Sequence, residues 1–560
     1  MPKIRVALWV FVAVMGVSTA LAASDAVIRG VVTDNAGKPI RGALVKATAG
    51  YKSVTRYSQK DGRYEITLPN GKYVVSAEAY LFESRRQTKD TAQEGETNFS
   101  LSPRVDVNLL TGSELESLLP DNVETRRIRV ECSSCHNLQR LMLKRGSTAK
   151  AWQDFLPTMT RGRYPVMVAP KVNPNASEAN FVALTEALGK YFGPDAPYLA
   201  PDADPPAPQL IKHTELSDAA LRATIREYEI PTPMPMPHSM SVDPVRGIAW
   251  WGEESWLANQ IGRFNIATET FEEYLVPTPN SSVHTGIVAK DGRYFVTLPS
   301  GGDAKLASVD PATGKVTEYK WPEKTCPRLP CRSGPHTIAL SREGNLWLSG
   351  GKSGEVWSFD VKTEQFAAHK FTLPQEYPKD SIALWTMGSG ESMPPIDANS
   401  YDIKEDSKGK LWFTIFRMGI LMSLDPSTGE TKRYQPPATP SMKGVAVDAQ
   451  DNVWFTNYNG HKLGRLDAKT GAIKQYQPPT QYSTPYGVLW DERTGYVWVS
   501  DLNGNNITRF DPRTEQFVEY LIPTHGAGLK FMAVDGKGRL WFTEVVGGKI
   551  GVVDPGDGSN

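Results

Sequence analysis

The chain has 560 residues, which is long enough for several domains rather than one core. Lys plus Arg and Asp plus Glu are equal at 62 each, so the formal net charge is zero. This balance gives no reason to expect nucleic acid or an anionic membrane surface as a partner.

Residues 1–23 have the shape of a secretory signal peptide. Lys3 and Arg5 precede an apolar run, and small residues close the segment. The run is shorter than the ~20 residues that a membrane span needs, which favours cleavage over an uncleaved anchor. No later segment is long and apolar enough to span a bilayer. We therefore expect a periplasmic or secreted protein that is not an integral membrane protein after cleavage.

Residues 25–108 are typical of a small β-sandwich. Apolar and polar residues alternate around turn signals at Asn35-Ala36-Gly37 and Asp61-Gly62. The stretches GVVTDNAGKPIRGALV and DGRYEITLPNGKY resemble the carboxypeptidase regulatory-like (transthyretin-like) domain. The resemblance implies a packing or docking module and says little about activity.

Residues 110–193 change to a helical pattern. The segments around CSSCH, TAKAWQDFLPTM and SEANFVALTEALGKYF each predict a helix. Residues 194–221 then form a proline-rich linker, expected to be extended. A compact helical unit is thus predicted between two β regions.

The motif within the helical unit is Cys-X-X-Cys-His, with Cys132, Cys135 and His136. This is the attachment pattern of haem c. On a helix start, the two cysteines share one face and can bond both porphyrin vinyl groups, which places His136 under the iron as its proximal ligand. Export agrees with this interpretation. A redox disulfide would want a βαβ context, and a zinc site would need further Cys or His ligands nearby; the unit offers neither.

The helical unit also resembles the monohaem cytochrome c domains attached to periplasmic oxidoreductases. The resemblance lies in CSSCHNLQRL, AWQDFLPTMTRG and a last helix ending KYFGP. It implies a methionine as sixth iron ligand, for which Met159 fits best and Met167 is the rival. A buried methionine is more often core filler. His/Met ligation would favour electron transfer over oxygen activation.

The other two cysteines, Cys326 and Cys331, bracket PRLP in a loop-like stretch. Free thiols are a liability in an oxidising compartment, so we predict a local disulfide between them.

Residues 222–560 carry a recurring motif. GKLWFTIFRMGILMSLDPSTGET and DNVWFTNYNGHKLGRLDAKTGAI are two of its copies, and most copies are spaced by ~40–45 residues. This period predicts a seven-bladed β-propeller. The last copy lacks an outer strand, and REYEIPTP at 226–233 is expected to complete it, since open edges invite aggregation. The aromatic anchors are Trp250, Tyr294, Trp347, Trp412, Trp454, Trp498 and Trp541. The predicted fold class is therefore multidomain and mainly β, with a β-sandwich, a small all-α cytochrome c unit and a propeller.

Aligning the blades at their first strand places one polar residue per blade near the channel mouth. Each of them carries a charged or proton-exchanging group, which predicts a polar ring facing a shared funnel; the alternative is that some face loops and solvent. By this alignment the residues are His238, His284, His336, Tyr401, Lys443, Tyr486 and Lys530.

A second ring follows the Trp-Phe-Thr type strand. Glu253 and Glu544 fall on neighbouring blades of this ring, so with His238, His284 or His336 they are candidate catalytic residues. Such a group could bind a divalent cation or supply a base and its orienter. The full second ring reads Glu253, Thr297, Gly350, Ile415, Asn457, Asp501 and Glu544.

The segments WFTE at 541–544, WFTN at 454–457 and GPHTIAL at 334–340 resemble the virginiamycin B lyase (streptogramin lyase) propeller family. The resemblance implies opening of a cyclic depsipeptide ester by elimination, with a histidine base and Mg²⁺ on the axis. The family pattern puts a histidine beside the glutamate-bearing strand, where this chain has Val545-Val546. His461 is the only histidine close to such a strand, which puts the elimination in doubt.

Three functions follow as hypotheses. The first is an exported haem protein whose propeller binds an unknown small molecule or partner and whose haem exchanges electrons with a periplasmic donor or acceptor. The second is a lyase of the streptogramin type, and the third a non-catalytic binding scaffold. A bound quinone such as PQQ is less favoured, because the tryptophan-docking pattern of eight-bladed quinone propellers is not seen here.

Overall fold

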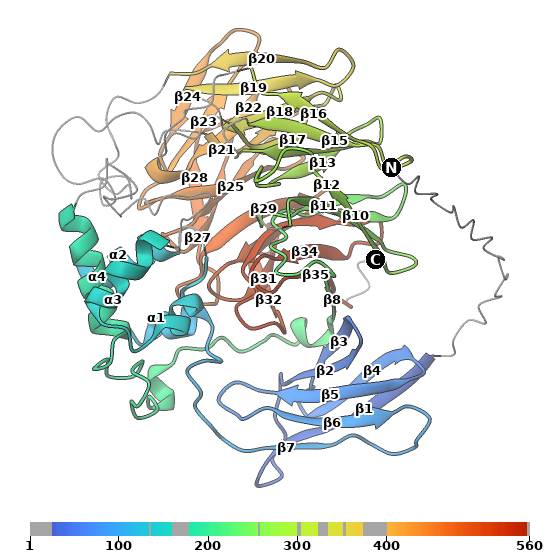
Figure 1. Ribbon diagram of the computed structural model, residues 1–560, viewed down its shortest axis with the longest axis vertical. Helices are drawn as coiled ribbons and strands as arrows, with labels where there is room; N and C mark the ends of the chain where they lie inside the picture. The colour runs from blue at the N-terminus through green and yellow to red at the C-terminus, as the bar shows by residue number, and fades with distance from the viewer. Residues whose placement is uncertain are drawn as a thin grey trace, which may run out of the picture.

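The computed structural model describes residues 25–133, 136–158, 178–255, 258–299, 304–322, 334–350, 354–372 and 400–556. Figure 1 shows a β-sandwich at one end, a helical unit beside the propeller, and the propeller itself. Within the described ranges, no helix is both long enough and apolar enough to cross a bilayer.

The N-terminal region is a two-layered β-sandwich. Alternate side chains of β4 are buried, as expected for strands with one face on a core. The core between the layers includes Ile28, Val32, Ile66 and Val75. One layer has the order β4 (Arg63–Pro69), β1 (Asp25–Asp34) and β7 (Phe99–Leu101); the other has β3 (Lys52–Tyr57), β2 (Leu44–Ala49), β5 (Lys72–Glu78) and β6 (Arg85–Asp90).

The middle region is helical, as its sequence pattern predicts. Asn122 caps α2 by accepting a hydrogen bond from the backbone N–H of Thr125. The described elements are α1 (Gly112–Ser117), α2 (Val123–Cys132), η1 (Leu138–Lys144), α3 (Ala149–Phe155), η2 (Leu156–Thr158) and α4 (Glu178–Phe192). One expectation was wrong: Cys132 is the last residue of α2, so the Cys-X-X-Cys-His motif begins at a helix end rather than at a helix start.

The proline-rich stretch 194–221 is not a free spacer. Leu199 and Ile211 are buried in the same core as Trp152 and Phe192 of the helical unit. Two short 3-10 turns, η3 (Pro208–Leu210) and η4 (Ala220–Arg222), interrupt it. Part of the segment therefore belongs to the helical unit, because burial in that core removes its apolar side chains from water.

The C-terminal region is a propeller with seven four-stranded blades among the described residues. The first strands of neighbouring blades lie against one another, and β33 lies against β9, which closes the ring. Blades one and two are β9 (Ser241–Asp243), β10 (Ile248–Gly252), β11 (Gln260–Asn265), β12 (Thr270–Leu275), and β13 (Gly286–Val288), β14 (Tyr294–Leu298), β15 (Lys305–Val309), β16 (Val316–Lys320). Blades three and four are β17 (Pro335–Leu340), β18 (Leu346–Gly350), β19 (Glu355–Asp360), β20 (Gln365–Lys370), and β21 (Ser400–Glu405), β22 (Leu411–Ile415), β23 (Ile420–Leu424), β24 (Thr431–Tyr434), with η6 (Phe416–Met418) after β22. Blades five and six are β25 (Met442–Val447), β26 (Val453–Asn457), β27 (Lys462–Leu466), β28 (Ile473–Tyr476), and β29 (Pro485–Asp491), β30 (Tyr496–Asp501), β31 (Asn506–Asp511), β32 (Gln516–Leu521).

Blade seven is completed by a strand from before blade one. It contains β33 (Leu529–Val534), β34 (Leu540–Glu544), β35 (Lys549–Asp554) and β8 (Thr224–Glu229), and β8 pairs antiparallel with β35. This confirms the predicted closing strand. The other edge of β8 pairs with β3 of the sandwich, so one sheet of eight strands runs from the propeller into the N-terminal domain. Neither edge of β8 is left open.

Candidate functional site at the mouth of the propeller

The seven residues aligned as the first ring lie together at one end of the propeller. Each stands just before or at the start of the first strand of its blade, and all seven are buried. The rings of His238 and His284 stack with centroids 3.7 Å apart, and the series continues through His336 to Tyr401 at 4.5 and 4.3 Å. We call these seven residues the axial ring.

The histidines of blades one to three form one part of it, the histidine arc (His238, His284, His336). Nδ1 of His284 lies 3.1 Å from the carbonyl oxygen of His336, and Nδ1 of His336 lies 3.0 Å from that of Tyr401. A carbonyl can only accept, so these contacts place a proton on Nδ1 of both rings. In the neutral form of each ring the lone pair then lies on Nε2.

Blades four to six supply the tyrosine arc (Tyr401, Lys443, Tyr486). The Lys443 ammonium lies 4.1 Å from the centroid of Tyr486 and 4.5 Å from that of Tyr458, with Tyr401 and Phe416 at 5.2 and 4.6 Å. Four aromatic faces around one cation give an attractive electrostatic environment. The hydroxyls of Tyr401 and Tyr486 are hydrogen-bonded to each other.

A hydroxyl on the second strand of most blades holds the axial ring in place. Thr456, for example, accepts from the backbone N–H of Gly444 in its own blade and donates to the carbonyl of Tyr486 in the next. This inter-blade latch explains why the repeats read Trp-Phe-Thr. The same donation to the next ring carbonyl is made by Thr297, Ser349, Thr414, Ser500 and Thr543.

Blade one departs from the latch rule. Gly252 occupies the hydroxyl position, and a Cβ there would lie 2.8 Å from the carbonyl oxygens of Val283 and His284. Ser239 replaces the missing hydroxyl by donating to the carbonyl of His284 at 2.9 Å.

Glu254 is a site residue that sequence alignment missed. Its carboxylate lies 3.8 Å from Nε2 of His238 and 3.3 Å from Nζ of Lys530, so it joins blades one and seven across the ring. Burial lowers the pKa of His238 well below its ordinary value, and the neighbouring His284 and Lys530 add to this effect. His238 is therefore neutral at ordinary pH.

The two glutamates expected at the site have other partners. Glu253 accepts hydrogen bonds from the indole Nε1 of Trp251 and the backbone N–H of Met236, and burial raises its pKa to about 7. Burial raises the pKa of Glu544 strongly, and the adjacent carboxylate of Glu227 raises it further. Glu253 is thus held by Trp251 and the backbone of Met236, and Glu544 lies beside Glu227 of β8.

Other second-ring residues bind loops. Asn457 donates to the carbonyl of Ala438, and Asp501 accepts from the backbone N–H groups of Thr484 and Gly504. His461 follows β26, with Nδ1 at hydrogen-bonding distance from the carbonyl of Ser483, and burial lowers its pKa to about 4.

The helical unit covers part of the same propeller end. The hydroxyl of Tyr458, which borders the tyrosine arc, donates to the carbonyl of Ser133, inside the Cys-X-X-Cys-His motif. The backbone N–H of Leu138, just after the motif, donates to the side chain of Asn503 at 2.9 Å. The guanidinium of Arg129 lies over the ring of Tyr482. These contacts hold Ser133 and the residues that flank the motif on blades five and six.

His136 has the contacts of an oriented imidazole. Its Nδ1 lies 2.8 Å from the carbonyl oxygen of Asn137, which again assigns the lone pair to Nε2. Burial lowers its pKa to about 4, and the positive charges of Arg140 and Lys530 contribute. Cys132 packs against the apolar core of the helical unit. The predicted residues Cys135, Met159, Met167, Cys326 and Cys331, like the signal segment 1–23, lie outside the described residues.

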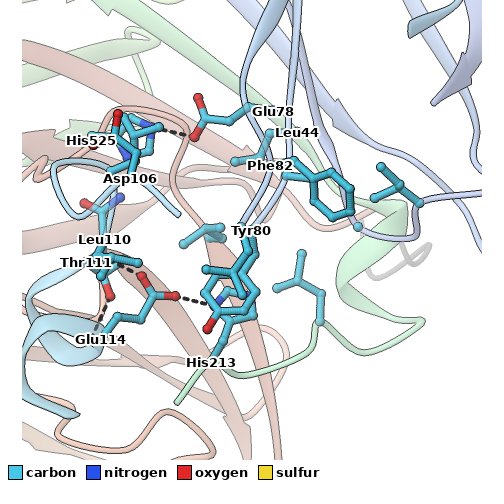
Figure 2. A pocket seen from close by; sticks show the side chains of 18 of the residues that line it. Leu44, Glu78, Tyr80, Phe82, Asp106, Leu110, Thr111, Glu114, His213 and His525 are labelled. Carbon is cyan, nitrogen blue, oxygen red and sulfur yellow. Dashed lines mark hydrogen bonds and ion pairs between the residues drawn. The ribbon is translucent and has the colours of Figure 1, made fainter. Parts of the chain in front are cut away.

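A separate cavity of about 270 Å³ lies where the sandwich, the helical unit, the 194–221 segment and a propeller loop meet. Figure 2 shows His213 bonded to Glu114 and His525 bonded to Glu78 at its wall. Tyr80 stacks on His213 with centroids 3.8 Å apart. We call this the junction cavity; its ion pairs tie the domains together.

Comparison with known proteins supports the two β regions. Residues 27–104 match the carboxypeptidase regulatory-like domain, and residues 390–559 match the virginiamycin B lyase family. A solved streptogramin B lyase is 22% identical over 60% of this chain and 99% of that one, with a TM-score of 0.50. A selenomethionine-substituted virginiamycin B lyase from Staphylococcus aureus is 20% identical over 59% and 99%, with a TM-score of 0.48. No curated protein matches the chain.

These matches establish a mainly β protein with a carboxypeptidase regulatory-like domain and a virginiamycin B lyase-like propeller region. The identities are low, so the structural likeness indicates a shared fold and carries no activity with it.

Proposed function

We propose that the chain is an exported c-type haem protein whose axial ring binds a small molecule or partner and whose haem exchanges electrons with a periplasmic donor or acceptor. The observation that carries the proposal is the contact between the ring and the attachment motif. Tyr458 touches Lys443 of the tyrosine arc and donates to Ser133 of the motif. A redox group attached at this motif would adjoin the ring.

The residues present fit a haem c. Cys132 and Cys135 would attach the haem covalently, and His136 would bind its iron. Nδ1 of His136 donates a hydrogen bond to the Asn137 carbonyl, and a metal-bound imidazole usually has such a partner. The low pKa of His136 keeps the ring neutral, which is the form that binds a metal. Met159, or alternatively Met167, is proposed as the sixth ligand. When bound, a haem c with His/Met ligation supplies one-electron transfer.

In this proposal the protein's own residues bind and orient the ligand. The Lys443 ammonium attracts a negative or electron-rich group, and the phenols of Tyr401 and Tyr486 donate or accept hydrogen bonds beside it. The lone pairs on Nε2 of His284 and His336 can accept protons. The helical unit contacts blades five and six at Tyr458, Tyr482 and Asn503.

The first test is a reduced-minus-oxidised visible spectrum of the chain expressed with a cytochrome c maturation system. We expect the sharp α-band of a covalent c-haem, with one haem per chain. Cys132→Ser should abolish covalent attachment, whereas the matched variant Cys326→Ser should retain it. A wild-type protein without haem bands under these conditions would overturn the proposal.

A streptogramin-type lyase is the second candidate, supported by the family match over 390–559. This function would use His336 or Glu544 as catalytic groups, with Mg²⁺ as the ion. It predicts that His336→Ala or Glu544→Ala abolishes ester opening while His136→Ala does not. The electron-transfer proposal predicts that His136→Ala removes redox activity. A binding scaffold, the third candidate, would show neither dependence.

A further inference from the structure

The histidine arc contains a group of three metal-ligating side chains. Donor atoms of His238, Glu254 and His284 all lie within 4.8 Å of one another. His238 and His284 are 1% and 2% exposed, and the Glu254 side chain is 10% exposed. Among the described residues, these three are the His, Cys, Asp or Glu side chains that lie close enough together to hold a metal ion. We propose that it binds a divalent transition-metal ion of the zinc class.

The donor set selects the class of ion. Two imidazoles and one carboxylate suit Zn²⁺, and Mn²⁺ or Fe²⁺ after it, whereas Mg²⁺ prefers oxygen ligands and water. Zn²⁺ bound at about 2.0–2.1 Å holds its ligand atoms about 3.3 Å apart. The separation of 3.8 Å between Nε2 of His238 and Oε2 of Glu254 is close to this, so small side-chain rotations complete the site.

The surroundings orient the imidazoles for coordination. The contact from Nδ1 of His284 to the His336 carbonyl directs its Nε2 lone pair, and metal-bound histidines usually have such an outer partner. Nδ1 of His238 is buried and has no hydrogen-bond partner in the described part of the chain. An ion at Nε2, the nitrogen that faces Glu254, would bind the other side of this ring.

The proposed site has three protein ligands. Three protein ligands leave a fourth position, which is the arrangement of catalytic rather than structural zinc. The ring of His336 lies 4.5 Å from that of His284 and borders this position. A ligand bound there would also reach the tyrosine arc through Tyr401.

Lys530 provides an internal competitor. Its ammonium lies 3.3 Å from the Glu254 carboxylate and balances that charge without a metal. A divalent ion must work against this positive charge at close range, since like charges repel most strongly where water is excluded. Removing the Lys530 charge should therefore strengthen metal binding.

The test is calorimetric titration of chelator-treated full-length protein with Zn²⁺. We expect one ion per chain, not displaced by excess Mg²⁺. His284→Ala and Glu254→Gln should each weaken binding by more than the ~10–100-fold typical of losing an outer partner. His369→Ala is the matched control: this histidine lies on β20, bonded to Ser358, and its loss should leave the affinity unchanged.

Two further variants distinguish loss of a metal ligand from misfolding and from loss of haem. Lys530→Met should tighten binding, and a gain of affinity does not arise from misfolding. His136→Ala should leave the affinity unchanged, so the result does not depend on the haem proposal. Absence of Zn²⁺ binding by the wild type would overturn the inference, as would equal binding by the wild type, His284→Ala and Glu254→Gln.

Discussion

The histidine arc and the tyrosine arc occupy equivalent positions in successive blades, and the same inter-blade latch holds both. Thr297 bonds to the carbonyl of His336 in one arc, and Thr456 bonds to that of Tyr486 in the other. Their side chains nevertheless form different environments. One arc has stacked imidazoles beside a carboxylate, and the other has a cation among aromatic rings. The repeat therefore fixes backbone position, while one side chain per blade carries the chemistry.

The same contrast extends to the helical unit. It contacts the propeller at Tyr458, Tyr482 and Asn503, which belong to blades five and six. The proposed redox group therefore adjoins the tyrosine arc, and the proposed metal ion lies in the histidine arc. A ligand spanning the ring would meet both.

The largest effect should come from two tryptophans on the second strands of blades five and three, one blade from each arc. Trp454 is fully buried and donates from Nε1 to Asp448, whereas Nε1 of Trp347 has no partner in the described residues. Both changes to Ala should cost about 3–5 kcal/mol, with Trp454→Ala the more costly because Asp448 also loses a donor. Denaturant unfolding followed by far-UV circular dichroism measures both. A milder loss for Trp454→Ala than for Trp347→Ala would contradict the ranking.

The next effect tests the blade that departs from the latch. Gly252→Ala should destabilise the protein by about 3 kcal/mol, the upper end for overpacking, because the new methyl group meets two backbone carbonyls. Gly536→Ala is a suitable control, since a Cβ there has no heavy atom within 4 Å. If both glycines tolerate Ala equally in thermal unfolding, the close approach at Gly252 is not a constraint.

The latch itself should matter equally in both arcs. Thr297→Val and Thr456→Val keep the side-chain shape, but each removes one hydrogen bond to a buried carbonyl and one from a buried N–H. Each should cost about 1–2 kcal/mol of unfolding free energy. Equal losses would support one shared device, and a loss confined to one arc would show that the arcs are held differently.

Much of this organisation could be predicted from the sequence, because the regular spacing of the repeated motif determines where the blades lie. The spacing of the Trp-Phe-Thr copies predicted the blades, and the missing outer strand pointed to REYEIPTP, which pairs as β8. Aligning one residue per blade also brought together side chains that lie in contact, such as His238 and His284. Each copy of the blade motif is a short local pattern, and its recurrence along the chain makes the blades recognisable.

The rest depended on where single side chains point. Alternation along the strand puts Glu253 on the face of Trp251, and Glu254 on the opposite one toward His238, a shift of one residue that alignment by motif does not resolve. The contact of Glu544 with Glu227 is not indicated by the repeats, because Glu227 comes from β8, which precedes blade one in the chain. Helix ends such as that at Cys132 are set by tertiary packing as much as by local pattern.

The smallest effect concerns His525, which lies outside the axial ring. Its pKa shifts upward, whereas that of His238 shifts downward. Burial alone would lower the pKa of His525, but the hydrogen bond and charge of Glu78 outweigh burial and raise the pKa above its ordinary value. The charge of Lys46 lowers this pKa, and the charge of Glu114 raises it. Because the folded state favours the protonated form, the stabilisation is complete below about pH 6.5 and is lost as pH rises through the raised pKa. Glu78→Gln should therefore lower the melting temperature at about pH 5.5–6, and the difference from wild type should vanish toward pH 8–9. An NMR titration should show the pKa of His525 falling in the variant. A melting-temperature difference independent of pH would mean that Glu78 acts by packing at the junction cavity rather than through its charge.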